Sequence, residues 1–214
     1  MSIDFYYTPG SGPCRIVELV AKTVGVKLVQ KPLDLMKKEQ LSPEFVKINP
    51  QHCVPTIVDN DLVLWESNVI ATYLLEQYSK DDSLYPKDTK KRALVDQRLY
   101  FNNGVLAQRF GEYYYPIMMT GAAPDLEKYK RMEEALEFLN TFLKSQEFVA
   151  GNNLTVADYV ISTTITTFLV AKFDISPYKD VEKWYKKVKG IIPGFGEFND
   201  VEALTKLFEK YLKK

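Results

Sequence analysis

The sequence predicts an α/β domain at the N-terminus followed by an all-helical domain. Across about the first 78 of the 214 residues, stretches with strand character alternate with amphipathic helical stretches. The polar segment 79–88, which contains one proline, then reads as a linker. Beyond it strand signals largely stop, and apolar residues recur at helical spacing. We therefore expect one domain at 1–80 and a second at 88–214, in a chain long enough to bury a sizeable core.

The N-terminal elements follow from turn residues and hydrophobic spacing. Residues 3–7 predict a strand, and the turn TPGSGP ends in Pro13, which suits the first turn of a helix. That helix continues from Cys14 until Gly25 ends it. The other expected elements are a strand at 26–30, a short helix from 42 to 48, a hairpin of 54–58 and 62–64, and a helix after Glu66-Ser67. This β-α-β-α-β-β-α order indicates a small mixed sheet covered by helices.

The second domain reads as five helices, at roughly 88–119, 125–144, 155–170, 180–190 and 201–212. Thr155 and Asp158 have the spacing of a capping box, with aspartate in place of the usual glutamate, which predicts a structural role. The lysine-rich runs 183–189 and 206–214 predict solvated helix faces.

Composition excludes several function classes. Lys+Arg and Asp+Glu are both 28, so no global charge draws the chain to nucleic acid or to an anionic membrane. No apolar run approaches the ~18–20 residues of a membrane span, and the first residues lack a signal-peptide pattern. Two cysteines and one histidine make a disulfide framework or a zinc site improbable. We expect a cytoplasmic protein with free thiols.

The stretch Ser11-Gly12-Pro13-Cys14 carries the most chemical information. It resembles the Cys-x-x-Cys loop of thioredoxin, with serine in the position of the reactive cysteine. A helix N-terminus favours an anion there, through unpaired N–H groups and the helix dipole. Serine does not supply a thiolate, but it can donate a hydrogen bond to one. The loop therefore suits a bound thiol cofactor.

Two further markers point the same way. Val54-Pro55-Thr56 opens a strand and resembles the loop around the cis-proline of thioredoxin-like folds, since proline adopts a cis bond at little cost. Glu66-Ser67 precedes a helix whose amides and side chains can hold the charged end of a peptide. Six stretches carry a wider resemblance: FYYTPGSGPCR (5–15), KINPQHCVPT (47–56), LWES (64–67), QRLYF (97–101), YYYP (113–116) and AGNNLTVAD (150–158). Together they resemble the insect delta class of cytosolic glutathione transferases, or a closely related epsilon-like class, over nearly the whole chain.

This resemblance implies the glutathione transferase fold, a thioredoxin-like α/β domain plus an all-α domain. It implies an enzyme that joins glutathione to hydrophobic electrophiles, as a homodimer without metal or nucleotide, with detoxification as its role. Peroxidase and dehydrochlorinase activities stay open. Ser11 would hydrogen-bond the glutathione sulfur. The implied glutathione contacts are Gln40, His52, Val54, Pro55, Glu66, Ser67 and Asn68. Gln40 stands where histidine is common and Asn68 where arginine is common, so positive charge is missing from a site for an anionic ligand.

The resemblance also places the electrophile between the domains. The implied pocket residues are Leu106, Phe110, Tyr113, Tyr115 and Phe208, with Tyr211 as a further lid residue. At helical spacing such aromatic residues also suit a core, and both interpretations stay open here. Ala107 replaces a tyrosine often found at that position, which would widen the pocket.

Two other functions compete with conjugation. A thiol–disulfide oxidoreductase would use Cys14, but Ser11 occupies the place of its partner cysteine. A carrier protein would sequester hydrophobic ligands, but the presence of Ser11 with His52, Glu66 and Ser67 argues against it. Turnover with a generic aromatic electrophile separates all three.

Overall fold

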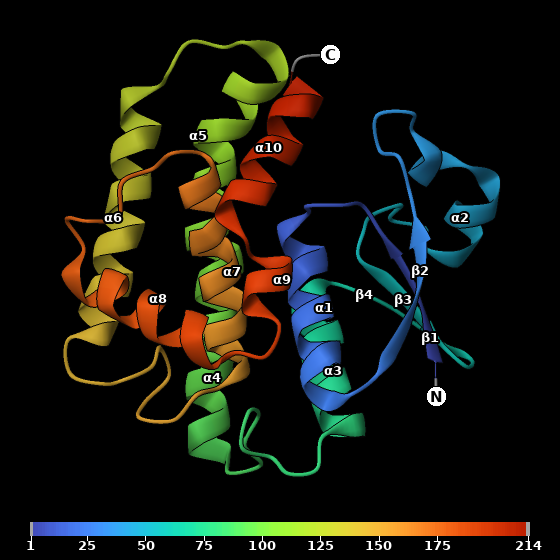
Figure 1. Ribbon diagram of the computed structural model, residues 1–214, viewed down its shortest axis with the longest axis horizontal. Helices are drawn as coiled ribbons and strands as arrows, with labels where there is room; N and C mark the ends of the chain where they lie inside the picture. Colours follow the sequence, from blue (N-terminus) through green and yellow to red (C-terminus); the bar gives the residue numbers. More distant parts are fainter. Residues whose placement is uncertain (1, 213–214) are drawn as a thin grey trace. The chain divides into compact units, whose positions relative to one another are not determined.

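The computed structural model describes the backbone of residues 2–212 and the side chains of residues 2–209. The chain forms two compact units, each described by itself. The first comprises Met1–Asp82 with Pro193–Phe198, and the second comprises Ser83–Ile192 with Asn199–Lys214. Figure 1 shows a mixed sheet with helices in the first unit and helices in the second, which confirms the predicted fold class.

The first unit is built on a four-stranded sheet in the order β2-β1-β3-β4. Strands β1 and β2 are parallel, whereas β3 runs antiparallel to both β1 and β4. The elements are β1 (Ser2–Tyr7), α1 (Gly12–Val24), β2 (Lys27–Pro32), a 3₁₀ turn (Glu39–Leu41), α2 (Pro43–Ile48), β3 (Thr56–Asp59), β4 (Leu62–Trp65) and α3 (Ser67–Tyr78).

Helices cover both faces of this sheet. In Figure 1, α1 and α3 lie together on one face and α2 lies on the other. Phe5 and Ile57, paired across β1 and β3, are fully buried, and so is Leu74 of α3. Burial of such large apolar side chains is the main stabilising contribution here, at about 1.5–3 kcal/mol for each one.

A short helix from late in the sequence completes the first unit. Helix α9 (Phe195–Phe198) packs against α1, and Lys22 forms an ion pair with Glu197. Gly194 has a φ of 76°, and a Cβ atom there would lie only 2.5 Å from Cδ of Lys22. Glycine therefore permits this close approach, and the sequence analysis expects no element at this place.

The regular elements of the second unit, within the residues that the structure describes, are helices, apart from one isolated β-bridge between Phe148 and Gly151. Its elements are α4 (Thr89–Phe101), a π-helical turn (Asn102–Leu106), α5 (Ala107–Thr120), α6 (Leu126–Leu143), α7 (Val156–Val170), α8 (Lys179–Ile191) and α10 (Val201–Leu212). The single helix expected at 88–119 is therefore divided by one π turn. The side chain of Asn102 is buried in that turn and accepts a 2.8 Å hydrogen bond from Thr164 Oγ1 of α7.

The start of α7 confirms the predicted capping box. Both halves of the box are present, with the carboxylate of Asp158 accepting from the Thr155 backbone N–H at 2.8 Å. The other carboxylate oxygen accepts from Val149 N at 3.0 Å and from Trp184 Nε1 at 2.8 Å. Asp158 therefore joins the start of α7 to the preceding loop and to α8.

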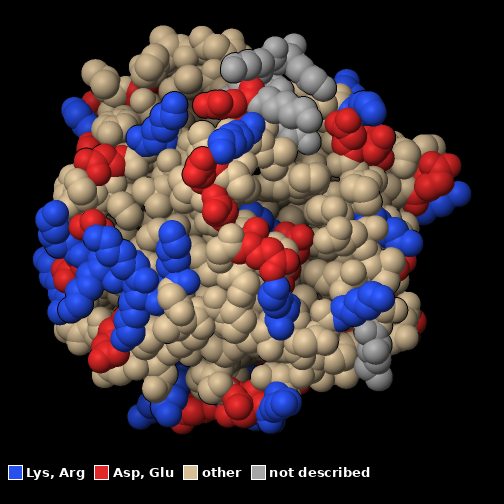
Figure 2. Space-filling model, in the orientation of Figure 1, with Lys and Arg blue, Asp and Glu red and all other residues tan. Residues whose placement is uncertain are grey.

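The lysines of α8 lie at the surface, as the sequence predicts for residues 183–189. Figure 2 shows Lys and Arg side chains gathered over α8, and Lys186 and Lys187 pair with Glu182 and Glu147 respectively. Across the described residues, no helix is both long enough and apolar enough to cross a membrane.

Candidate functional site

The register of the sheet brings four loops of the first unit to one edge. Tyr7, the last residue of β1, pairs with Pro32, the last residue of β2. Beside them, Thr56 at the start of β3 pairs with Tyr6 and with Trp65 at the end of β4. Four loops therefore leave the sheet at the same edge: the loops after β1 and β2, the loop before β3 and the loop after β4. All the predicted glutathione contacts lie on these loops or on the helical turns that they enter.

Ser11 lies at the N-cap of α1. It is half-buried, its backbone N–H donates to Thr8 O at 3.3 Å, and its carbonyl accepts from Arg15 N at 3.0 Å. The buried Arg15 donates from Nε to Gly10 O at 3.2 Å, which fixes the turn before the helix. The Ser11 side chain makes no capping hydrogen bond to its own helix. The Ser11 hydroxyl and the N–H groups in the first turn of α1 can therefore both donate hydrogen bonds to a bound anion.

Cys14 is a poor nucleophile in this setting. Its side chain is buried on the inner side of α1, and this burial raises the pKa of the Cys14 thiol to about 11. A hydrogen bond with the Ser11 side chain lowers the pKa, but burial outweighs it. At pH 7 roughly one Cys14 thiol in 10⁴ would be ionised, and the thiolate is the reactive form.

Asn49 fixes the loop before β3. Its buried side-chain amide donates to Cys53 O at 3.2 Å and to Thr56 Oγ1 at 2.8 Å. Its Oδ1 accepts from Gln51 N at 2.9 Å. One side chain therefore bonds to Gln51, Cys53 and Thr56, and it fixes the backbone conformation of residues 52–55.

That backbone presents His52 and Val54 outward. His52 is exposed and has a φ of 43°, and its N–H donates to Asn49 O at 2.9 Å. The Val54–Pro55 bond is cis, as the sequence resemblance predicts, and Pro55 is buried. In the described part of the chain, neither backbone group of Val54 has a hydrogen-bond partner. Val54 can therefore pair with an extended peptide ligand as a strand would.

Glu66, Ser67 and Asn68 form the entry into α3. Glu66 is the N-cap, with a φ of 71° that is uncommon for a residue other than glycine, and its side chain is exposed. Such left-handed residues concentrate at ligand sites, and each costs about 1–3 kcal/mol. The conformation points to a binding role for this turn.

Gln40 lies in the 3₁₀ turn after β2. Its Oε1 atom is buried, and within residues 2–209 no hydrogen-bond partner is offered to it. A buried acceptor left unsatisfied costs about 1–3 kcal/mol, so this oxygen favours a ligand that brings a donor.

The residues of the second unit that are predicted to contact the electrophile differ from one another in burial and packing. Leu106 is 0% exposed and Phe110 is 4% exposed, with the Phe110 ring 4.7 Å from the ring of Phe168. The Tyr113 ring packs against Tyr129 at 5.2 Å, and Phe208 is half-buried on α10. The side chain of Tyr211 lies outside the described residues.

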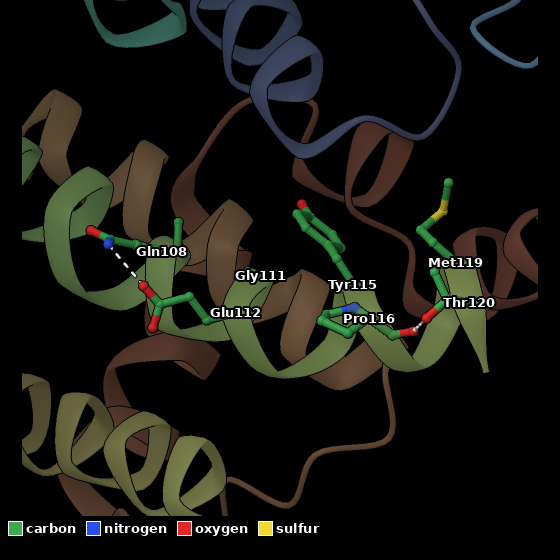
Figure 3. A pocket seen from close by; sticks show the side chains of 8 residues that line it. Gln108, Gly111, Glu112, Tyr115, Pro116, Met119 and Thr120 are labelled. Atoms are coloured by element: carbon green, nitrogen blue, oxygen red, sulfur yellow. Dashed lines mark hydrogen bonds between the residues drawn. The ribbon is translucent and has the colours of Figure 1, made fainter. Parts of the chain in front are cut away.

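One face of α5 bears an open hollow of ≈ 620 Å³ with a largely apolar lining. Among the predicted pocket residues only Tyr115 lines it, and its side chain is 58% exposed (Figure 3). The lining residues are Ala107, Gln108, Gly111, Glu112, Tyr115, Pro116, Met119 and Thr120. Sequence reasoning identified Ala107 and Tyr115 but missed the rest. The recurrence of lining residues every fourth position from Ala107 to Met119 is the signal that could have found them.

Within the described residues, no group of three His, Cys, Asp or Glu side chains is placed to hold a metal ion. Both cysteines are free thiols.

Comparison with known proteins identifies the family. The family profile of the glutathione S-transferase N-terminal domain matches residues 1–76, and that of the C-terminal domain matches residues 70–190. A delta-class glutathione transferase of Nilaparvata lugens is 52% identical, with a TM-score of 0.93 over 97% of this chain and 99% of that chain. An epsilon-class enzyme from the housefly Musca domestica is 34% identical, with a TM-score of 0.89 over 97% of each chain. A glutathione transferase homolog from Drosophila mojavensis, solved with bound glutathione, is 34% identical, with a TM-score of 0.87 over 99% of this chain and 96% of that chain. The chain belongs to the glutathione S-transferase family.

Proposed function

We propose that this enzyme activates the glutathione thiol with Ser11 and conjugates it to hydrophobic electrophiles. The observation that carries the proposal is the N-terminus of α1, where the Ser11 side chain makes no capping hydrogen bond to the helix and the helix terminus favours an anion. The Cys14 sulfur beside it is buried and protonated at neutral pH, so it does not serve as the reactive sulfur at this helix terminus.

The four loops at the sheet edge supply the other contacts with glutathione. Val54, positioned by the cis Pro55, pairs its backbone with the cysteinyl part of the peptide. His52 faces the glycine carboxylate, and Glu66 with Ser67 holds the γ-glutamyl end. Gln40 and Asn68 contribute neutral amides to the same site. The Drosophila mojavensis homolog with bound glutathione supports the choice of ligand.

The reaction follows from the pKa of the bound thiol. A free thiol has a pKa of about 8.5 and is mostly protonated at pH 7. A hydroxyl donor and a helix N-terminus both favour the charged form, so the thiol loses its proton to water when bound. With an aryl chloride, the thiolate forms a carbon–sulfur bond while the carbon–chlorine bond breaks and chloride leaves. Ser11 stays neutral and donates its hydrogen bond throughout.

The electrophile binds in the hollow on α5, with Tyr115 as a wall. Leu106 and Phe110 support this helix from the core, while Tyr113 and Phe208 remain further candidates for the pocket. The apolar lining fits hydrophobic xenobiotics, and their detoxification in the cytoplasm is the role we propose. Peroxidase and dehydrochlorinase activities need the same thiolate and are tested with organic hydroperoxides and chlorinated insecticides.

A homodimer is proposed as the working assembly. This proposal rests on the resemblance of the chain to cytosolic glutathione transferases. Sedimentation at micromolar concentration tests this, and a monomer would contradict it.

The pH dependence of kcat/KM tests the role of Ser11. Ser11→Ala should lose about 1.5–3 kcal/mol of transition-state stabilisation, or roughly ten- to a hundredfold in rate. The rising limb of its kcat/KM against pH should move to higher pH. Cys14→Ala should keep both the rate and the profile. A normal profile for Ser11→Ala, or collapse of a folded Cys14→Ala variant, would instead favour an oxidoreductase. Absence of any conjugation by the unmodified enzyme would favour a carrier protein.

A further inference from the structure

Gly111 occupies the middle of α5, where glycine is less favourable for a helix than alanine. Its backbone is helical, so no positive φ requires glycine there. A Cβ atom at Gly111 would lie 2.9 Å from Cε2 and 3.1 Å from Cδ2 of the Tyr115 ring. The ring of Tyr115 therefore occupies the space that any larger residue at position 111 would need.

The missing side chain at position 111 leaves room for the Tyr115 ring. The ring lies back over the preceding turn of α5 and meets the Phe110 ring edge-on, with centroids 6.3 Å apart at 88°. In Figure 3 the side chains of Tyr115 and Met119 project from the same side of the helix. A ring pushed off Gly111 would move into the hollow, because the hollow is the open space beside it.

The polar groups of the hollow limit which electrophiles it accepts. Glu112 is the only charged residue in the lining, and its carboxylate accepts from Gln108 Nε2 at 2.9 Å. Its other oxygen lies 3.5 Å from Arg131 Nη1. Among the lining residues that the structure describes there is no cation for an anionic substrate, and the half-buried Glu112 is already paired with Arg131, so the hollow suits an uncharged electrophile.

We propose that Gly111 and Tyr115 form a specificity-determining pair, in which the absence of a side chain at position 111 leaves room for the tyrosine ring and the hollow receives an uncharged, planar aromatic electrophile against that ring. This inference rests on the proposed function. Aromatic rings gain attraction from offset or edge-on contact beyond the area they bury, so an exposed, well-positioned phenol ring selects planar aromatic partners.

A double-mutant cycle tests the pair, with a nitro-substituted aryl chloride as the probe. Gly111→Ala should raise the KM for the aryl chloride several-fold while the KM for glutathione changes by less than about twofold. Tyr115→Ala should raise the same KM, and the double variant should be no worse than Tyr115→Ala alone. Gly190→Ala is the matched control, because a Cβ atom there meets nothing within 4 Å.

Thermal unfolding supplies a readout that does not depend on activity. Gly190→Ala should raise Tm, as a glycine-to-alanine change in a helix does without an obstacle. Gly111→Ala should raise Tm only when Tyr115→Ala is also present. The proposed pair is wrong if Gly111→Ala leaves the KM for the aryl chloride unchanged, or if the effects of Gly111→Ala and Tyr115→Ala on this KM are fully additive. Either result leaves the proposed function intact, provided that the unmodified enzyme conjugates the aryl chloride. If the unmodified enzyme conjugates nothing, the proposed function fails and this inference fails with it.

Discussion

Replacing Asp158 by alanine should destabilise the second unit far more than the loss of an ordinary helix cap. The side chain of Asp158 is fully buried. Its two oxygens accept four hydrogen bonds, from Val149 N, from Thr155 N and Oγ1, and from Trp184 Nε1, at distances between 2.8 and 3.2 Å. These donors belong to a loop, to the start of α7 and to α8, so one carboxylate connects three segments.

The expected magnitude follows from the donors left behind. In Asp158→Ala, three buried N–H groups lose their acceptor, and each unsatisfied group costs about 1–3 kcal/mol. Water entering the vacated space recovers part of this loss. We therefore expect a decrease of about 3–5 kcal/mol in the free energy of unfolding, against ~0.5–2 kcal/mol for a simple cap. Turnover per folded molecule should stay near normal, because Asp158 belongs to neither substrate site.

Asp88 provides the matched control. It is the exposed N-cap of α4 and accepts one hydrogen bond, from Lys91 N at 2.9 Å. Urea unfolding of both alanine variants, followed by Trp184 fluorescence in a Trp65→Phe background, reports on the second unit. A loss for Asp158→Ala no larger than that for Asp88→Ala would refute the reasoning. So would lost turnover in a variant of unchanged stability.

Two further predictions concern the first unit. Burial raises the pKa of Glu18 to about 7, with nearby Arg15 opposing and Glu197 adding to the shift. Ionising Glu18 therefore weakens the folded state as pH rises from about 4.5 to 7, and Glu18→Gln should gain stability relative to the unmodified chain between pH 5 and pH 8. If the difference in urea midpoint between Glu18→Gln and the unmodified chain stays constant between pH 5 and pH 8, the raised pKa of Glu18 is contradicted. Asn68→Arg should lower the glutathione KM several-fold, because a charge-assisted hydrogen bond contributes ~1.5–3 kcal/mol at best and less when exposed. An unchanged KM would show that Asn68 does not limit binding.

The sheet could be predicted because its signals are local. Alternating apolar residues define β1, and the β-α-β order requires its parallel pairing with β2. The expected strand 54–58 begins only at Thr56, since Pro55 has no N–H for the ladder and its peptide bond with Val54 is cis. The glutathione contacts were assigned from the resemblance to the family, and the strand order explains why these residues, far apart in the sequence, lie at one edge of the sheet.

Features that depend on distant partners were missed. The π turn inside the helix expected at 88–119 is anchored by Asn102, whose hydrogen-bonding partner Thr164 lies 62 residues away. Helix α9 follows a Pro-Gly pair that locally predicts only a loop. It packs against α1, again far along the chain, and buries Phe195. Hydrophobic periodicity carries no information about such contacts.

The two faces of α5 show why the electrophile residues were harder to assign than the glutathione loops. Leu106 and Phe110 are four residues apart and fill the core, whereas Ala107, Gly111 and Tyr115 follow the adjacent row and border the hollow. A substrate-facing row is apolar like the core, so periodicity alone does not separate the two. Side-chain volume does separate them. Leu106 and Phe110 fill their space in the core. In the adjacent row the exposed Tyr115 ring covers the space beside Gly111, and the row borders the open hollow.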